Sequence, residues 1–278
     1  MGMPASANEA DVILLFGGDG TIHRHLGQLV RLGLPVLVVP AGSGNDFARA
    51  LRLVRVRDSL MAWRRFCAGA DNLRRVDLGV ISAVEIAGGS PVPHGPWYFC
   101  SVASIGLDAE VARRANRLAR WVRGHGGYLL SLAPAIFTFA PVPMKILTPV
   151  EDAAGGNKGG NNNDHCWTTR SAQSTLLAAF ANTPSYGGGM RIAPHAKMDD
   201  GLLDVCIVGS IDPFKLFCMF PTIYSGQHLK IKKVEYFQTG RVRVETEHPL
   251  DVYADGEYVC PTPIKVAVQR AALTVVTL

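Results

Sequence analysis

The amino-acid sequence predicts an α/β fold in two parts: a parallel α/β layer up to about residue 76, followed by a mostly β part. The first part contains two apolar, β-branched runs, and each leads through a glycine-containing loop into a helix, as in a parallel sheet. The second part contains short apolar runs separated by glycine, proline and asparagine, with one helical stretch near residues 108–135. A chain of 278 residues is long enough for about two domains with a sizeable core.

The chain begins with a short segment, residues 1–10. These residues are small and polar, and they lack the apolar stretch of a secretory signal peptide. We therefore expect a disordered leader that carries no targeting signal.

The first strand is predicted at residues 12–16, where apolar residues follow one another as in a strand buried on both faces. The loop Gly17–Thr21, with the sequence GGDGT, follows directly. Its glycines allow backbone N–H groups to turn toward an anion, and Thr21 opens a helix whose positive end faces the same point. Asp19 would repel a phosphate unless it serves a metal ion, a hydroxyl group or a proton transfer, so it indicates chemistry as well as binding. A plain strand-to-helix turn is the alternative, but GGDGT directly after an apolar strand favours a phosphate loop.

A second unit of the same design follows. Residues 34–39 form another apolar run, residues 40–44 (PAGSG) a flexible loop, and residues 45–51 the start of a helix. Because ligands of parallel sheets bind beyond the carboxyl ends of the strands, both glycine loops are expected to meet at one crevice, with the Ser43 hydroxyl available to a phosphate. Asn45 and Asp46 are more often helix caps than ligands, so we expect them to support the loop.

Basic residues are unevenly distributed over a chain whose net charge is +5. Arginines are crowded in residues 49–75 and again in residues 113–123, where apolar residues form one side of the predicted helix. A basic amphipathic helix with an aromatic residue suits the anionic surface of a membrane, and the solvated face of a packed helix is the alternative. Nucleic-acid binding is not expected, because the basic residues are not interleaved with stacking aromatics in a recognisable module.

The second part of the chain contains no predicted membrane span. Residues 128–143 are the best candidate, but they fall short of the ~20 apolar residues that a spanning helix needs and contain three prolines. Six scattered cysteines without a CxxC pair favour reduced thiols and a cytoplasmic protein. Residues 151–164 are rich in glycine and asparagine and are expected to form a disordered loop; a functional lid is the less favoured alternative.

Two acidic motifs complete the candidate chemistry. Asp255 and Glu257 follow a strand on a glycine turn, which places two carboxylates where one could take a proton from a substrate hydroxyl. Residues 199–204 (DDGLLD) form the second motif. By itself each motif is ordinary turn chemistry. His228 is expected to be a structural histidine rather than a base.

The order of these motifs carries a family resemblance. GGDGT at 17–21, followed by PAGSGNDFAR at 40–49, resembles the catalytic domain of the diacylglycerol kinase and sphingosine kinase superfamily, particularly its bacterial soluble lipid kinases. Further segments resemble the motifs of that family in the same order, at residues 76–79, 100–111, 181–190, 194–205 and 254–257. The resemblance runs from the GGDGT strand to the C-terminus, and the ordered set is far more specific than any single motif.

The resemblance implies a division into domains. Residues 11–76, together with about 265–278, would form a Rossmann-like α/β nucleotide-binding domain of the NAD kinase and diacylglycerol kinase type. Residues 77–264 would form a mostly β, sandwich-like C-terminal domain, with the disordered loop at about 151–165. Family members normally begin with a strand and an Asn-Pro-x-Ser-Gly-like loop before GGDGT. This chain has only residues 1–10 there, so we expect a truncated domain that lacks the first phosphate loop.

The resemblance also implies roles for individual residues. Either Glu257 or Asp255 would accept a proton, and Asp19 on the opposite wall would position the substrate hydroxyl or a magnesium ion. The stretch with Lys197, Asp200 and Leu202 would hold Mg²⁺ through one carboxylate and two main-chain oxygens, which suits a hard cation. The nucleotide-binding residues would be Gly17, Gly18, Asp19, Gly20, Thr21, Ile22, His23, Ser43, Gly44 and Asn45.

These implications predict an ATP-dependent lipid kinase that uses Mg²⁺ and phosphorylates the hydroxyl of a diacylglycerol-like or sphingoid lipid. The expected partners are a lipid substrate at the membrane surface and a peripheral membrane contact. The sequence leaves open whether the chain forms a homodimer. One alternative is a phosphotransferase like the NAD kinases, which share the GGDGT loop; the SGND loop and the DDG and DGE motifs favour the lipid enzymes. The other is a catalytically impaired lipid- or nucleotide-binding remnant, against which the intact Asp19, Asp255 and Glu257 argue.

Overall fold

The computed structural model describes residues 2–84, 95–117, 125–150 and 166–278. The strands are β1 Ile13–Gly17, β2 Val36–Pro40, β3 Leu73–Ala83, β4 Trp97–Phe99, β5 Val102–Gly106, β6 Val142–Pro149, β7 Trp167–Ala181, β8 Leu203–Gly209, β9 Val234–Thr239, β10 Arg241–Thr246, β11 Asp251–Ala254, β12 Glu257–Pro261 and β13 Ile264–Val276. The helices are α1 Asp19–Leu32, α2 Asp46–Ala50, α3 Val56–Cys67, α4 Leu107–Arg117, α5 His125–Thr138, α6 Pro213–Met219 and α7 Thr222–Ser225, with short 3₁₀ turns at η1 Ala7–Glu9 and η2 Gln227–Lys230.

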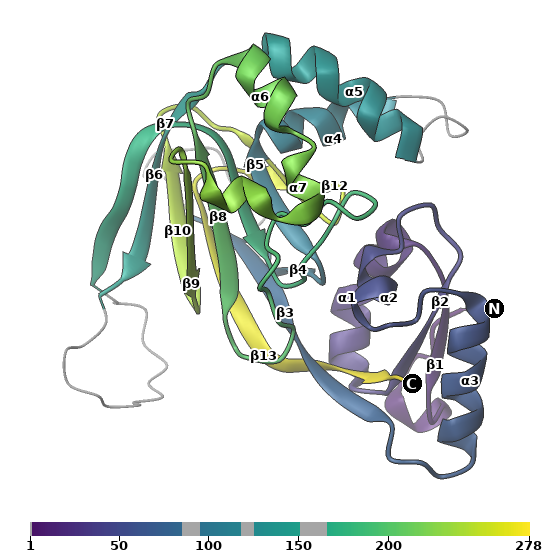
Figure 1. Cartoon of the computed structure of the whole chain (residues 1–278). Coiled ribbons are helices and arrows are strands. Elements are labelled where there is room, and N and C mark those ends of the chain that lie inside the picture. The colour runs from purple at the N-terminus through teal and green to yellow at the C-terminus, as the bar shows by residue number, and fades with distance from the viewer. Residues whose placement is uncertain (1, 85–94, 118–124, 151–165) are drawn as a thin grey trace.

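These elements form a small α/β lobe and a larger lobe that is mostly sheet (Figure 1). The small lobe contains β1, β2 and helices α1 to α3, and the long strands β3 and β13 connect it to the larger lobe. Among the described residues, nine strands are joined by hydrogen bonds in the order β1-β2-β13-β10-β6-β7-β5-β11-β12; β3 with β4 branches off at β13, and β8 with β9 branches off at β7. Strand β2 pairs in parallel with both β1 and the end of β13, whereas the pairs within the larger lobe are antiparallel. The mixed α/β class expected from the sequence, with a mostly β second part, is confirmed.

The last strand reaches both lobes. Two alternating runs of the sequence, residues 264–269 and 272–276, both belong to β13. Its pairing with β3 shifts between Gln269 and Leu273, and Ala271 in this interval has a left-handed φ of 49°. Because of this shift, the first half of β13 pairs with β10 in the larger lobe and its end pairs with β2 in the small lobe.

The N-terminal segment differs from the expected disordered leader. Residues 2–10 are placed, and residues 7–9 form the turn η1. The Ala5 N–H donates to the Glu9 carboxylate at 3.0 Å, and Met3 packs against the core of the small lobe. One apolar side chain and one local cap therefore fix a segment whose composition is otherwise that of a tail.

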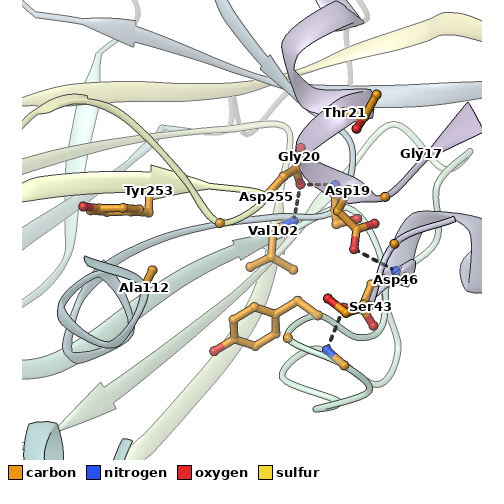
Figure 2. Close-up of a pocket in the computed structure, with 18 of the residues that line it drawn as sticks. Gly17, Asp19, Gly20, Thr21, Ser43, Asp46, Val102, Ala112, Tyr253 and Asp255 are labelled. Atoms are coloured by element: carbon orange, nitrogen blue, oxygen red, sulfur yellow. Dashed lines mark hydrogen bonds between the residues drawn. The ribbon is translucent and has the colours of Figure 1, made fainter. Parts of the chain in front are cut away.

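The two glycine loops leave the same edge of the sheet, because β1 and β2 are parallel and in register. Their main chains touch: a Cβ atom on Gly42 would lie 2.5 Å from the Cα atom of Gly18. Figure 2 shows Gly17, Asp19 and Gly20 of the first loop near Ser43 of the second. The crevice that the sequence predicted is present.

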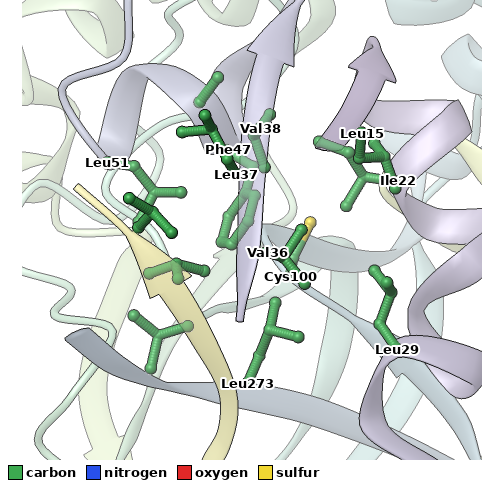
Figure 3. Close-up of a cluster of buried hydrophobic side chains, with 14 of the residues drawn as sticks. Leu15, Ile22, Leu29, Val36, Leu37, Val38, Phe47, Leu51, Cys100 and Leu273 are labelled. Carbon is green, nitrogen blue, oxygen red and sulfur yellow. The ribbon is translucent and has the colours of Figure 1, made fainter. Parts of the chain in front are cut away.

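The core of the small lobe holds these loops in place (Figure 3). Helix α1 buries Ile22, Leu26 and Leu29, which lie on one face of the helix at spacings of four and three residues. The helix ends at Gly33, whose φ of 65° gives the left-handed cap that closes many helices. Leu273 of β13 belongs to the same cluster, so the end of the chain packs beneath the site.

The helices of the larger lobe cover one face of its sheet. The stretch predicted near 108–135 contains α4 and α5 in its described parts, and apolar side chains from both helices pack with those of β7 and β8. Sequence analysis did not predict α6 and α7. A start signal was present, because Asp212 caps α6 by accepting from the Lys215 N–H at 3.0 Å and is followed by Pro213 at the first helical position.

Some predictions fall on residues without a description. The loop 151–165 lies outside the described residues, as do residues 118–124 of the basic stretch 113–123. Among the residues that are described, no helix combines the length and the hydropathy that a membrane crossing requires. The six cysteines are free thiols, as expected, and Cys100, Cys206 and Cys260 are buried.

Candidate active site

A cavity of about 850 Å³ lies where the glycine loops face the larger lobe. Helix α1 and its loop contribute one wall, and the loop after β2 contributes the floor. The larger lobe supplies the opposite wall, with Val102 and Tyr253 among its residues (Figure 2). The polar and glycine residues of the lining are Gly17, Gly18, Asp19, Gly20, Thr21, Arg24, Gly42, Ser43, Gly44, Asp46, Ser101, Ser104, Asp108, Tyr186, Gly187, Gly188, Tyr253, Asp255 and Gly256.

Asp19 is the first residue of α1 and lines this cavity half-buried. Its two carboxylate oxygens accept from the backbone N–H groups of Asp46 at 3.1 Å and Phe47 at 3.2 Å, so it caps α2 from the neighbouring loop. Burial, followed by the negative charge of Asp46, raises the pKa of Asp19 above its ordinary value. A carboxylate oxygen can accept two hydrogen bonds, and each oxygen of Asp19 accepts one from the backbone.

Asn45 and Asp46 were expected as helix caps. Asn45 stands at the N-cap of α2 but makes no capping hydrogen bond with its side chain, and both residues contact the loops instead. The Asn45 side chain accepts from the Gly42 N–H at 2.9 Å and donates to the Gly42 carbonyl at 2.6 Å, which closes the loop on itself. The buried Asp46 carboxylate accepts from the Arg49 guanidinium at 2.5 Å and from the Gly188 N–H at 2.8 Å. Asp46 therefore links the small lobe to a loop of the larger one.

Asp255 is a buried anchor. It lies in the turn between β11 and β12 with a φ of 50°, and its side chain is 0% exposed. One carboxylate oxygen accepts from the N–H groups of Ser101 at 2.8 Å and Val102 at 3.3 Å. The other accepts from the Cys100 N–H at 2.9 Å and from His23 Nδ1 at 3.2 Å. Both oxygens of Asp255 are thus fully used within the protein.

Glu257 is the third predicted carboxylate. It begins β12, is half-buried, and is not part of the cavity lining. A Cβ atom on Gly20 would lie 2.8 Å from Glu257 Oε1, so the carboxylate rests against the start of α1. The structure places the three acidic residues near the start of α1: Asp19 and Asp255 line the cavity, whereas Glu257 lies against Gly20 outside the lining.

Comparison with known proteins agrees with this arrangement. The diacylglycerol kinase catalytic domain matches residues 3–81, and the YegS C-terminal NAD kinase beta sandwich-like domain matches residues 101–277. A diacylglycerol kinase of Mycobacterium tuberculosis is 32% identical over 279 residues, which cover 98% of this chain and 78% of that protein. The chain belongs to the diacylglycerol kinase and YegS-like family of lipid kinases.

More distant relatives support the same family. A diacylglycerol kinase of Bacillus subtilis is 25% identical over 91% of this chain and 73% of its own length. A YegS-like lipid kinase of Chromohalobacter salexigens is 29% identical over 90% of this chain and 71% of its own length. Two crystal structures from Bacillus anthracis, each named for a diacylglycerol kinase, superimpose with TM-scores of 0.71 and 0.62 at 20% and 16% identity, and each covers 98% of this chain and 78% of the other. At that identity the structures confirm the fold, and the family identifies a kinase-type enzyme.

The nucleotide-binding residues predicted from the sequence divide into two groups. Gly17–Thr21, Ser43 and Gly44 line the cavity. Ile22 points into the core, His23 contacts Asp255, and Asn45 closes its own loop, so these three are placed to support the lining.

The residues predicted to hold magnesium lie elsewhere. Lys197, Asp200 and Leu202 are absent from the cavity lining, and the Asp200 carboxylate accepts from the Leu202 N–H at 3.0 Å. Across the described part of the chain, no group of three or more His, Cys, Asp or Glu side chains is arranged to hold a metal ion. The predicted magnesium site consists of one carboxylate and two main-chain oxygens, so it is not a group of this kind.

Sequence analysis missed several side chains of the cavity. Arg24 lies one turn after Gly20 on the outward side of α1, and its Nε donates to the Gly20 carbonyl at 3.0 Å. Asp108 accepts from the Ser104 hydroxyl at 2.5 Å and from the Tyr186 hydroxyl at 2.8 Å. The spacing of four residues from Gly20 to Arg24 was visible in the sequence, whereas the meeting of Asp108 with Tyr186 depends on the tertiary fold.

Proposed function

We propose that this chain is an ATP-dependent lipid kinase that transfers the γ-phosphate of ATP to the hydroxyl group of a diacylglycerol-like or sphingoid lipid. Membership of the lipid kinase family supports the reaction class. The observation that carries the proposal is the contact between the two glycine loops directly beside the carboxylate of Asp19. Phosphoryl transfer depends mainly on holding the phosphates, neutralising charge and orienting the attacking hydroxyl, and this cavity offers groups for each task.

The loops fit a nucleotide phosphate. A Cβ atom on Gly18 would lie 2.9 Å from Gly42 Cα, and one on Gly44 would lie 2.8 Å from Asp19 Oδ2, so side chains at these positions would fill the cradle. The N-terminus of α1 faces the cavity, and the positive end of the helix dipole there favours an anion. The Arg24 guanidinium adds the positive charge that phosphates require.

Magnesium would act in two places. The ion that accompanies ATP neutralises charge on the phosphates. The carboxylate of Asp200, with the main-chain oxygens of Lys197 and Leu202, offers oxygen donors that suit a second Mg²⁺. Since these residues do not line the cavity, that ion would stabilise the loop and take no part in transfer.

We assign proton acceptance to Asp19. Its carboxylate lines the cavity, keeps acceptor capacity, and has a raised pKa, so it binds a proton more readily than an ordinary aspartate. Asp255 has no acceptor position left, and Glu257 lies behind Gly20. This assignment reverses the roles expected from the sequence: Asp255 and Glu257 hold the walls, and Asp19 contacts the reacting hydroxyl.

The test uses the purified chain with radiolabelled ATP, Mg²⁺ and a panel of hydroxyl lipids in mixed micelles, with NAD as a soluble acceptor. We expect a phosphorylated lipid. Asp19→Asn should reduce kcat at least ~100-fold with little change in KM for ATP, because the amide cannot accept the proton. Glu257→Gln should retain the larger part of the activity. Label in NAD alone would support the NAD kinase-like alternative, and binding without transfer would support a non-catalytic remnant.

The same assay separates the three carboxylates. Asp255→Asn should reduce activity together with thermal stability, since a buried anchor is lost. If Glu257→Gln abolished transfer while Asp19→Asn retained it, Glu257 would be the acceptor and our assignment would be wrong.

A further inference from the structure

Three phenylalanines form an exposed patch at the end of the larger lobe. Phe214 is 68% exposed and Phe217 is 48% exposed, and they lie three residues apart on the same side of α6. Phe137 at the end of α5 is 56% exposed, and its ring centroid lies 6.0 Å from that of Phe217. In Figure 1, α5 and α6 lie next to each other on the outer side of this lobe, away from the small lobe. We call these three residues the aromatic patch.

The patch lies over an apolar pocket. On the other side of α6, Leu216, Met219 and Phe220 line this pocket together with apolar side chains of β7, β8 and α5. Asp108 and Tyr186 line the same pocket and also the active-site cavity. The pocket beneath the aromatic patch therefore adjoins the active-site cavity at Asp108 and Tyr186.

The chain segment that contains α6 and leads to β9 is positively charged. Residues 212–233 contain four lysines and one acidic residue. Lys215, Lys230, Lys232 and Lys233 are exposed, and none of the ion pairs found among the described residues includes them. The Lys233 carbonyl accepts from the Gly209 N–H at 2.8 Å, which places this lysine at the end of β8 that leads into α6. The only acidic side chain, Asp212, is already used to cap α6.

We propose that the aromatic patch and these four lysines form a docking surface for a bilayer of anionic lipids. The phenylalanine rings would enter the interface between headgroups and acyl chains, and the lysines would bind the negatively charged headgroups. The proposal deepens the proposed function, on which its biological use rests, because docking here brings the apolar pocket and the adjoining active site to the membrane that contains the substrate.

The positive charge of the lysines favours an anionic membrane over a second copy of the chain as the partner of this surface. In a two-fold dimer each patch would meet its own equivalent, so the lysines of one copy would face the lysines of the other. A membrane of anionic lipids presents the opposite charge over the whole area. The described part of the basic helix α4 is less suitable, because Arg113 and Arg114 both bind the Glu110 carboxylate, at 2.7 Å and 2.6 Å.

The first test measures co-sedimentation with vesicles of phosphatidylglycerol and phosphatidylcholine, without ATP. We expect Phe214→Ser/Phe217→Ser to weaken binding at least ~10-fold. The control is Leu60→Ser/Met61→Ser, a pair of exposed apolar residues on α3 of the small lobe, which should bind as the unaltered protein does. An unaltered protein that fails to bind these vesicles would refute the proposal, as would equal binding of both variants.

The second test removes charge. Each lysine near an anionic surface contributes about a fivefold gain in affinity, so Lys232→Gln/Lys233→Gln should lose ~25-fold on phosphatidylglycerol vesicles and little on pure phosphatidylcholine. Arg64→Gln/Arg65→Gln, exposed on α3, is the matched control. Sedimentation velocity completes the set: a dimer that disappears in Phe214→Ser/Phe217→Ser would make the patch a contact between copies and overturn the proposal.

Failure of docking and failure of the proposed function give different results. If the protein phosphorylates no lipid, vesicle binding is still measured in the absence of ATP. If it is a lipid kinase, the phenylalanine variant should phosphorylate a short-chain lipid in detergent micelles at the normal rate and lose activity only on vesicles. An equal loss of activity in micelles would show that the patch maintains the structure of the enzyme, and it would contradict membrane docking.

Discussion

His23 Nδ1 lies 3.2 Å from Asp255 Oδ2, although 232 residues separate the two in the sequence. His23 belongs to α1, which carries the GGDGT loop, and Asp255 belongs to the turn before β12. The same carboxylate holds the main chain of residues 100–102 through N–H groups. One buried acid thus joins the nucleotide loop to the wall of the larger lobe.

The first prediction concerns the pH dependence of this contact. Burial opposes protonation of His23, but the hydrogen bond and negative charge of Asp255 outweigh burial, so the pKa of His23 is raised from 6.5. A group whose folded-state pKa is raised stabilises the fold below its unfolded pKa, and this contribution is lost as pH rises through the folded pKa. We expect His23→Gln to lower the free energy of unfolding by about 1–3 kcal/mol at about pH 5.5 and by much less at about pH 9.

Urea unfolding of both proteins over this pH range provides the measurement. Glutamine keeps a neutral hydrogen-bond donor but cannot gain charge, so it isolates the effect of protonation. His25→Gln on the same helix is the control. A difference between the unaltered protein and His23→Gln that stays constant with pH would contradict a charged contact.

The second prediction concerns Gly20 and Glu257. A methyl group on Gly20 would lie 2.8 Å from Glu257 Oε1, at the flexible end of its side chain, so Gly20→Ala should displace this carboxylate and reduce kcat no more than ~10-fold. Shortening Glu257 in the double variant Gly20→Ala/Glu257→Ser should restore part of the lost kcat. Gly27→Ala on the same helix meets nothing within 4 Å and should be neutral or slightly stabilising.

Steady-state kinetics of the single and double variants forms a double-mutant cycle. Additive effects of Gly20→Ala and Glu257→Ser would show that the two residues act separately, against the contact in the structure.

The third prediction concerns the contact between the glycine loops. Gly42→Ala would place a methyl group 2.5 Å from Gly18 Cα, where only backbone is present to yield. The loops must separate, and KM for ATP should rise at least ~10-fold with a smaller change in kcat. Ser43→Ala, at the next position, removes one hydroxyl and should change KM for ATP no more than ~5-fold. If both variants had the same KM, close contact of the loops would be irrelevant to ATP binding.

The sequence was sufficient to predict the crevice because its signals are local. An apolar run followed by glycines marks a strand and a loop, and parallel strands place their loops at one edge, so Gly18 and Gly42 could be expected near each other. The ordered motifs also predicted the family correctly.

The roles within the site could not be derived in the same way. Asp255 in DGE reads as an exposed turn residue, and its burial depends on N–H groups from residues 100–102 and on His23. The sequence contains no sign of these distant partners. The aromatic patch was missed for a related reason: Phe214 and Phe217 on α6 were not placed on a helix, and their exposure depends on which side of α6 packs on the sheet.

The last prediction concerns Asp77, which holds the irregular point of β13. Its buried carboxylate accepts from the N–H groups of Ala271 and Gly201, both at 2.7 Å, and so joins β3, the shift in β13 and the loop that precedes β8. Asp77→Ala would leave two N–H donors without their acceptor, which costs about 1–3 kcal/mol each where the groups are buried. We expect the free energy of unfolding to fall by about 2–4 kcal/mol in urea titrations. Asp71→Ala, at an exposed position in the loop before β3, should change it by less than about 0.5 kcal/mol. Equal stability of the two variants would mean that the Asp77 carboxylate is not required to hold the register shift in β13. A large loss confined to Asp77→Ala would show that one side chain fixes the strand on which both lobes depend.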